Sequence, residues 1–274
     1  MLDVLFIAPG NAKGIYQDLA NDYSAIEPPT WALLLAESCR STGFVPQIID
    51  VTAQQLSHQD VVDKINSILP RVIVLVVYGQ NVNSGTTGMS GAVILTNFIK
   101  QKNIEIPIVY IGSHVQALPV ETLKKESSID IVCLNEGVYA LQNLLKLSTI
   151  NIKTLSTVNG IGYKKDKKVY LTKPERVVPQ DRMDIDLPGY AWDLLPYDKQ
   201  PLDLDRSPMW HAEYDFDKRS PYAAIQTSLG CNFKCNFCMI NIINKDDNEE
   251  VGVASNYSMM RYWSTEFIIK EFDK

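Results

Sequence analysis

The first 147 residues alternate between short apolar runs and longer segments whose apolar positions have helical spacing. The stretch 71–78 contains VIVLVVY, a continuous β-branched run of the kind found in strands buried on both faces. The segment 30–41 places Trp31, Leu34 and Leu35 on one helical face, and Gly43 follows as a stop signal. The pattern predicts strands at 2–8, 45–51, 71–78, 108–111 and 130–134 and helices at 30–41, 60–69, 91–101, 119–125 and 138–147.

Regular alternation of strands and helices predicts an α/β fold with a doubly wound, parallel, five-stranded sheet. Each predicted strand ends in a loop of small or polar residues, and these loops meet at the carboxyl edge of the sheet. Open α/β sheets bind their ligands at this edge. For Glu136 and Gly137 a ligand contact and a simple turn are equally good interpretations. The candidate binding residues are Pro9, Gly10, Gly79, Gly112, Ser113, His114, Glu136 and Gly137.

The regular alternation of predicted strands and helices ends after residue 147. Residues 160–172 predict a β-hairpin with a charged turn, and a Pro- and Asp-rich stretch follows. Its aromatic residues, among them Tyr190 and Trp192, indicate an ordered connector packed between two domains. From residue 221 the pattern predicts a strand at 222–227, a cysteine loop, and a helix at 262–272 with Ser264 as its N-cap. We therefore expect three parts: an α/β domain at 1–147, a connector at 148–220 and the start of another domain at 221–274.

Composition narrows the class of protein. The net charge of −6 argues against a non-specific nucleic-acid binder. No apolar run approaches the roughly 18 residues that a transmembrane helix needs, and the N-terminus lacks the basic flank of a signal peptide. Five cysteines, three of them clustered, do not make a disulfide framework. These features predict a cytoplasmic protein with neither a nucleic-acid nor a membrane partner.

The three clustered cysteines carry the strongest chemical signal. Cys231, Cys235 and Cys238 form a C-x3-C-x2-C pattern after a predicted strand. Thiolates are soft ligands that suit iron–sulfur clusters or zinc, and three ligands leave one iron of a [4Fe–4S] cluster open. A zinc site with His211 as fourth ligand is the alternative. The remaining two, Cys39 and Cys133, sit in apolar segments and are expected in the core.

This cysteine pattern, with an aromatic residue before the last cysteine, resembles the radical S-adenosylmethionine (SAM) superfamily. The resemblance implies that the methionine moiety of SAM chelates the open iron, and that the reduced cluster cleaves SAM to release a 5′-deoxyadenosyl radical. It also implies that Phe237 lies near the adenine. An external electron donor of the flavodoxin or ferredoxin type would then be a partner.

The segments 28–44, 111–123 and 130–145, in this order before a radical SAM motif, resemble the cobalamin-binding domain of B12-dependent radical SAM enzymes. The D-x-H-x-x-G motif that supplies a cobalt-ligating histidine in methionine synthase is absent, and His58 does not fit it. His114 is left either as a cobalt ligand or as a loop histidine that contacts a ligand or caps the next helix. The loop APGNAKG lacks the G-x-G-x-x-G fingerprint of dinucleotide-binding sheets.

A complete (β/α)8 barrel takes about 250 residues, whereas the stretch after residue 221 provides about one βα unit. We therefore expect the chain to be the N-terminal part of a longer enzyme, with an independently folded first domain and little activity of its own. The favoured function is radical methyl transfer, or a radical rearrangement, on a small molecule that the sequence does not identify. The alternatives are a non-catalytic corrinoid-binding module and a zinc-stabilised α/β domain.

Overall fold

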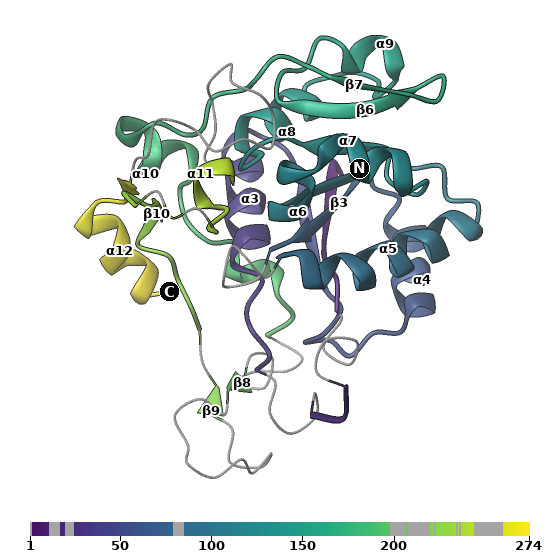
Figure 1. The fold of residues 1–274 in the computed structure, drawn as a ribbon. Coiled ribbons are helices and arrows are strands. Elements are labelled where there is room, and N and C mark those ends of the chain that lie inside the picture. The colour runs from purple at the N-terminus through teal and green to yellow at the C-terminus, as the bar shows by residue number, and fades with distance from the viewer. Residues whose placement is uncertain are drawn as a thin grey trace.

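A seven-stranded sheet forms the centre of the computed structural model, which describes residues 2–10, 17–19, 25–78, 85–197, 206–207, 220–221, 223–233, 235, 237–243 and 260–274 (Figure 1). The strand order is β2-β1-β3-β4-β5-β6-β7, and β1 to β5 are parallel. Every residue of β3 is buried, as expected from its continuous apolar run. The predicted parallel arrangement is confirmed. The parallel strands are β1 (Val4–Ala8), β2 (Pro46–Asp50), β3 (Val72–Val77), β4 (Ile108–Gly112) and β5 (Ile131–Cys133).

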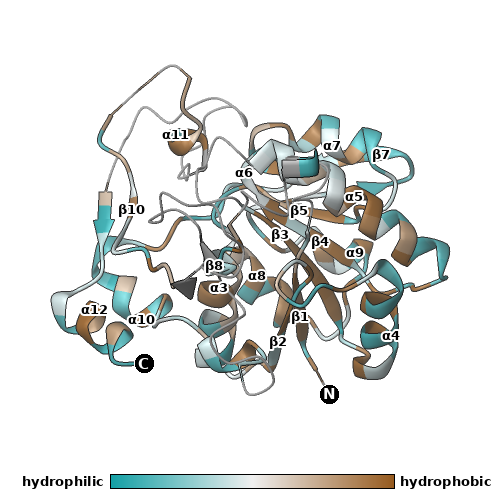
Figure 2. Ribbon diagram, turned by 90° about the horizontal axis from the view of Figure 1, so that it is seen from below, coloured by the Kyte–Doolittle hydropathy of each residue, from teal (hydrophilic) through white to brown (hydrophobic). Residues whose placement is uncertain are grey.

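Helices cover both faces of the sheet (Figure 2). Apolar side chains fill the two layers between the helices and the sheet. α3 (Thr30–Ser41) and α8 (Val138–Leu145) pack on one face, whereas α4 (His58–Ile68) and α5 (Gly85–Gln101) pack on the other. α4 begins before the predicted start because Ser57 and Asp60 form a capping box. No helix in the described ranges is long and apolar enough to span a bilayer. The shorter helical elements here are η1 (Gln17–Leu19), α6 (Ser113–Ala117), α7 (Pro119–Lys125) and α9 (Ile152–Leu155).

The predicted hairpin is present, and it continues the central sheet. β6 (Ile161–Lys165) pairs antiparallel with β5, and β7 (Lys168–Leu171) pairs antiparallel with β6. Asp166 and Lys167 turn the chain with positive φ angles of 49° and 62°. The expected boundary at residue 147 therefore falls within the span of one continuous sheet of seven strands.

The segment 177–197 packs on the same side of the sheet as α3 and α8. Val178, Leu187 and Tyr190 are all buried in that apolar layer. The aromatic residues 190 and 192 stack on each other, with ring centroids 5.3 Å apart. These contacts agree with an ordered connector; Trp210 lies outside the described residues. Its helical turns are η3 (Gln180–Arg182), α10 (Met183–Asp186) and η4 (Trp192–Leu194).

The remaining part forms small elements, of which β11 (Met260–Tyr262) and the start of α12 (Thr265–Phe272) contact this connector. β10 (Ser228–Gly230) pairs antiparallel with β11, and α12 follows with Ser264 as its N-cap, as predicted. The predicted strand at 222–227 is wrong over residues 223–227, because the Tyr190 hydroxyl binds the backbone N–H and carbonyl of Gln226 instead of a neighbouring strand. The other short elements are β8 (Arg206–Ser207), β9 (Ser220–Pro221) and α11 (Ile240–Ile243).

Candidate cofactor site

The carboxyl edge of the sheet gathers most of the predicted binding residues. Because β1 to β5 are parallel, the residues after each of them lie along one edge. The structure thus brings the ends of β1, β4 and β5 to the same side of the molecule. Gly79 and the loop residues 11–14 and 80–84 lie outside the described residues. The predicted residues placed at this edge are Pro9, Gly10, Gly112, Ser113, His114, Glu136 and Gly137.

Glycines at this edge let neighbouring backbones approach closely. A Cβ added at Gly112 would lie 2.2 Å from the carbonyl oxygen of Val77 at the end of β3. A Cβ added at Gly85 would lie 2.1 Å from the Ser113 hydroxyl. Gly137 adopts a φ of 83°, which favours glycine, and its N–H donates to the Asn135 side chain at 3.1 Å. These glycines are required by the packing of the edge itself, whatever binds above it.

Two buried polar atoms near this edge have no hydrogen-bond partner among the residues that the structure describes. Ser113 is fully buried and, in the part of the chain that the structure describes, its hydroxyl has no hydrogen-bond partner. The same holds for the side-chain oxygen of Gln116, whose NH₂ group donates to the Tyr78 hydroxyl and to the Asn135 carbonyl. Buried polar atoms are usually paired, so such groups are natural contacts for a polar ligand. Sequence reasoning missed Gln116, although a glutamine in an otherwise apolar stretch was a visible signal.

His114 lies in α6, beside the start of α5. Its Nδ1 atom is 3.1 Å from the Thr86 hydroxyl. Partial burial lowers the pKa of the ring below its ordinary value, and the nearby Lys125 lowers it further. The imidazole is therefore neutral near pH 7, which suits either contact predicted for it.

Glu136 is used differently from the other edge residues. Its carboxylate forms an ion pair with Arg261 of β11 at 2.8 Å, and both side chains are 2% exposed. The carboxylate also accepts the backbone N–H of Val178. In this arrangement Glu136 faces the C-terminal part of the chain. These contacts favour the turn interpretation of Glu136 over a ligand contact.

The three predicted cluster ligands lie on one short stretch after β10. Cys235 is exposed, and Cys231 and Cys238 are half-buried. In the described ranges no three His, Cys, Asp or Glu side chains are close enough together to hold a metal ion. Phe237 is 82% exposed. The three thiols are the right ligand type for an iron–sulfur cluster. In this structure they are not close together, so they would have to move toward one another to bind it.

The other two cysteines behave as predicted. Cys39 in α3 and Cys133 in β5 are buried and free. Burial raises the pKa of both thiols, so neither is a thiolate near neutral pH. The contrast with the accessible thiols after β10 separates core cysteines from candidate ligands.

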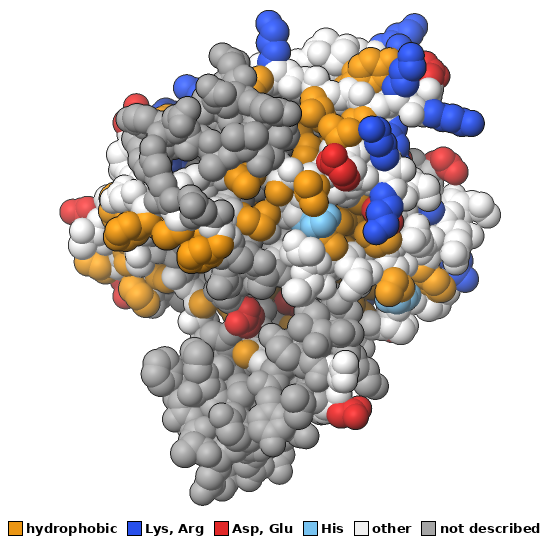
Figure 3. Space-filling model, in the orientation of Figure 1, with side chains coloured by type: hydrophobic (Ala, Val, Ile, Leu, Met, Phe, Trp, Pro, Cys, Tyr) orange, Lys and Arg blue, Asp and Glu red, His pale blue; other side chains and the backbone are white. Residues whose placement is uncertain are grey.

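The cysteine stretch folds back over the edge of the sheet. α11 begins two residues after Cys238 and packs against α6, the helix that carries Ser113 and His114. The buried Asn241 side chain donates to the Phe233 carbonyl at 3.1 Å and so ties α11 to the loop. Figure 3 shows apolar side chains in the centre of this face, with lysines and arginines toward α7 and the β6–β7 hairpin. The two predicted cofactor regions are therefore neighbours.

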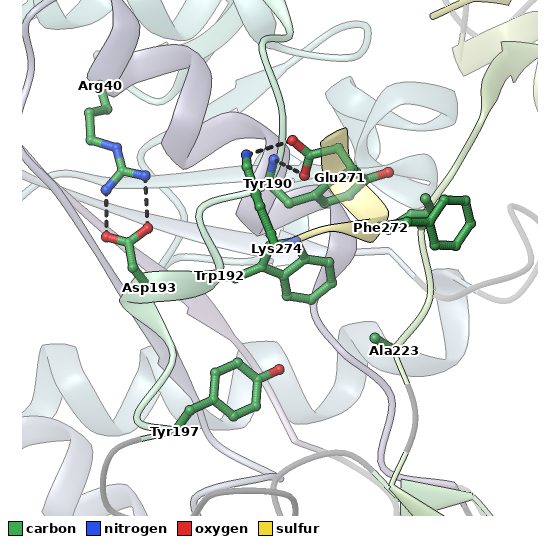
Figure 4. A pocket seen from close by; sticks show the side chains of 10 residues that line it. Arg40, Tyr190, Trp192, Asp193, Tyr197, Ala223, Glu271, Phe272 and Lys274 are labelled. Carbon is green, nitrogen blue, oxygen red and sulfur yellow. Dashed lines mark hydrogen bonds and ion pairs between the residues drawn. The ribbon is translucent and has the colours of Figure 1, made fainter. Parts of the chain in front are cut away.

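A cavity of about 700 Å³ lies elsewhere, between the end of α3, the segment 190–197 and α12 (Figure 4). Tyr190, Trp192 and Tyr197 line it, and Arg40 forms an ion pair with Asp193 at its rim. None of the predicted site residues lines it. Since α3 starts near the carboxyl edge of the sheet and runs away from it, this cavity is distinct from the candidate site.

Residues 16–145 match the family model of the B12 binding domain. The resemblance inferred from the sequence is thereby confirmed, because this match includes β2 to β5 and the candidate edge residues from Gly79 to Gly137. Residues 16–145 are thus similar to the B12 binding domain, and the chain has the fold of the corresponding part of cobalamin-dependent radical SAM enzymes.

Individual relatives are similar over most of this chain. An uncharacterized methyltransferase of Pyrococcus horikoshii, PH0819, is 28% identical over 211 residues, which are 77% of this chain and 40% of the relative. The cobalamin-dependent SAM radical enzyme OxsB, solved with aqua-cobalamin and SAM bound, covers 99% of this chain at 17% identity with a TM-score of 0.65. The radical SAM methyltransferase TsrM of Kitasatospora setae covers 100% at 12% identity with a TM-score of 0.58. This chain spans 31% of the OxsB chain and 45% of the TsrM chain, so it matches less than half of each relative.

Proposed function

We propose that this chain contributes the corrinoid-binding domain and the cluster loop of a cobalamin-dependent radical SAM enzyme. The cobalamin would lie along the carboxyl edge of the sheet, and Cys231, Cys235 and Cys238 would hold a [4Fe–4S] cluster with SAM at its open iron. The reaction would be radical methyl transfer, or a radical rearrangement, on a small-molecule substrate. An external electron donor of the flavodoxin or ferredoxin type would supply the electron.

One observation carries this proposal: the cysteine stretch returns to the sheet edge at which we place the cobalamin. α11, directly after the last cysteine, packs on α6 at the end of β4. A radical SAM cluster that acted without cobalamin would not need to lie beside this edge. Its closeness to the corrinoid edge supports a joint function.

The chain's own residues would then have distinct roles. Gly230, with a φ of 91°, lets the chain turn directly before Cys231. The Ser113 hydroxyl would donate or accept a hydrogen bond, and the Gln116 side-chain oxygen would accept one, in contacts with polar groups of the corrinoid. The exposed Phe237 would cover the adenine of SAM and exclude water from it. When bound, the cluster supplies the electron that splits SAM, and cobalamin supplies a transferable methyl group.

The test is anaerobic reconstitution of the 274-residue chain with iron and sulfide, followed by titration with hydroxocobalamin. We expect about four iron atoms per chain in the wild type. A Cys231, Cys235, Cys238 triple alanine variant should lose them while its cobalamin absorption spectrum stays unchanged. Cys39→Ala is the matched control and should keep its iron.

Other outcomes would replace the proposal. Equal iron in the triple variant and the wild type would remove the cluster assignment, and stoichiometric zinc would favour the zinc-stabilised domain. Cobalamin binding without any cluster would leave a corrinoid-binding module. Ser113→Ala is the sharper edge variant, because a bulky residue at Gly112 would collide with β3 rather than with a ligand.

A further inference from the structure

A buried ion pair connects the cofactor edge to the cysteine segment across 125 residues of sequence. Glu136, at the end of β5, faces Arg261 in the middle of β11, with Nη2–Oε2 at 2.8 Å and Nη1–Oε1 at 3.3 Å. Both side chains are 2% exposed. Arg261 is the bulkiest of the fully buried side chains in the described ranges. This fork-to-fork geometry fixes direction as well as distance.

The surroundings of the pair restrict it further. The backbone of Val178 contacts both charged groups: its N–H donates to Glu136, and its carbonyl accepts Arg261 Nη1 at 2.6 Å. On the other side, the Trp31 indole N–H donates to the Glu136 carbonyl at 3.2 Å. Elements from α3, the connector and β11 therefore converge on Glu136, the first through its backbone carbonyl and the other two through its carboxylate. A displacement of any of them would leave a buried polar group without its partner.

Each residue of the pair is connected through a few contacts to one of the two predicted cofactor regions. Arg261 is the register partner of Leu229, and Cys231 follows two residues later. In the other direction, Glu136 follows Asn135, whose carbonyl accepts the side chain of Gln116 in α6. The cluster loop and the corrinoid edge are thus joined through two strands, one ion pair and one hydrogen bond.

We propose that Glu136 and Arg261 are positioning residues that hold the cluster loop in register above the corrinoid edge. This inference rests on the proposed function. A buried pair of charges is a poor device for stability alone, because apolar residues of similar volume often replace it without loss. The pair is a good device for specificity, since it is satisfied in one arrangement only.

The first test measures position in the metal-free 274-residue chain. A background retains Cys238 as the one loop cysteine, with Cys231→Ser and Cys235→Ser, and His114→Cys places a second thiol on α6. A short bis-maleimide should cross-link the two thiols. Glu136→Gln in this background should lose the cross-linked product. Asp3→Asn breaks the Arg71–Asp3 ion pair, 2.9 Å long at the opposite edge of the sheet, and should retain it.

Two further variants separate position from folding. Glu136→Gln/Arg261→Met removes both charges, so no unpaired buried charge remains and the fold should survive. We expect this double variant to keep the thermal unfolding midpoint within a few degrees of the wild type and still to lose the cross-link. A fully restored cross-link would show that any packed pair suffices and would overturn the proposal, as would a cross-link retained in Glu136→Gln.

A second readout uses the loaded protein. With cob(II)alamin and the reduced cluster both bound, the paramagnetic resonance lines of the cobalt should be broadened by the neighbouring cluster. Glu136→Gln should narrow these lines while iron and cobalamin contents stay equal to the wild type. Unchanged broadening would contradict the positioning role. A protein that binds neither cofactor would refute the proposed function, whereas the metal-free cross-link would still decide whether the pair sets the position of the loop.

Discussion

The sheet and the C-terminal segment are held by different kinds of contact. β1 to β5 are stabilised by two continuous apolar layers, in which whole strands such as β3 have no exposed residue. The segment after residue 223 has a smaller apolar contribution, from Leu229, Trp263 and Phe267. It is attached mainly by directional polar contacts, such as the Gln180 side chain, which binds both the N–H and the carbonyl of Tyr262. The apolar layers of the sheet therefore provide most of the stability, whereas the polar contacts of the segment fix its position on the rest of the chain.

The largest loss of stability is expected when a buried apolar side chain of the sheet is truncated. Ile73 in β3 is fully buried, so Ile73→Ala should lower the free energy of unfolding by about 2–5 kcal/mol. Because the segment packs on the sheet, it should unfold in the same transition. Ile94 on α5 is 56% exposed, and Ile94→Ala should change stability by less than about 0.5 kcal/mol. Urea denaturation followed by circular dichroism measures both; similar losses would contradict the apolar account of the sheet.

A smaller, pH-dependent effect is expected at Asp50, at the carboxyl end of β2. Burial raises the pKa of this carboxyl to about 6. The folded state thus holds the proton more tightly than the unfolded chain. Stability should fall by about 2–3 kcal/mol as pH rises from about 4 to above 6, and then level off.

The dependence at Asp50 is tested by its isosteric variant. Asp50→Asn should lack this fall, so its advantage over the wild type should grow between pH 4 and pH 7. Asp60, exposed in the cap of α4, is the control of opposite sign. Its pKa is lowered by hydrogen bonds from Ser57, so its contribution is present at neutral pH and lost in acid. A flat difference between wild type and Asp50→Asn would show that Asp50 is not desolvated in the fold.

The smallest loss of stability is expected when a single hydrogen bond that attaches the segment is removed. The Tyr190 hydroxyl accepts the backbone N–H of Gln226 at 2.7 Å. Tyr190→Phe should cost about 1 kcal/mol and speed hydrogen exchange in residues 223–230 while β3 stays protected. Tyr170, 40% exposed on β7, provides the matched Tyr170→Phe control with no effect. Equal acceleration of exchange in both regions would contradict a local role of this hydrogen bond in attaching the segment.

Sequence patterns predicted the sheet well because its signals are local. α3 and α7 have the predicted bounds, the latter with a proline at its first position and both lysines in its last turn. The cysteine spacing and the core positions of Cys39 and Cys133 were equally readable. The α5 helix starts at Gly85, six residues before its predicted start, because three glycines in its first turns weaken the helical signal.

What the sequence did not reveal depends on contacts between distant residues. Nothing near Glu136 indicates that its partner is Arg261, 125 positions away. The pairing of β10 with β11 joins strands of only three residues, too short for a period-two pattern. The Ser113 hydroxyl, which has no hydrogen-bond partner among the described residues, is visible only once α5 and β4 are packed together.

The hairpin that extends the sheet has a consequence for how the protein behaves in a crowded solution. β5 has only three residues, and without β6 its backbone would offer an open edge to other chains. The hairpin moves that edge outward to β7, which begins at Lys168 beside a turn rich in lysine. Charged edges resist strand-to-strand association. A corrinoid domain isolated without its hairpin should therefore be prone to self-association, whereas one that ends beyond β7 should stay dispersed.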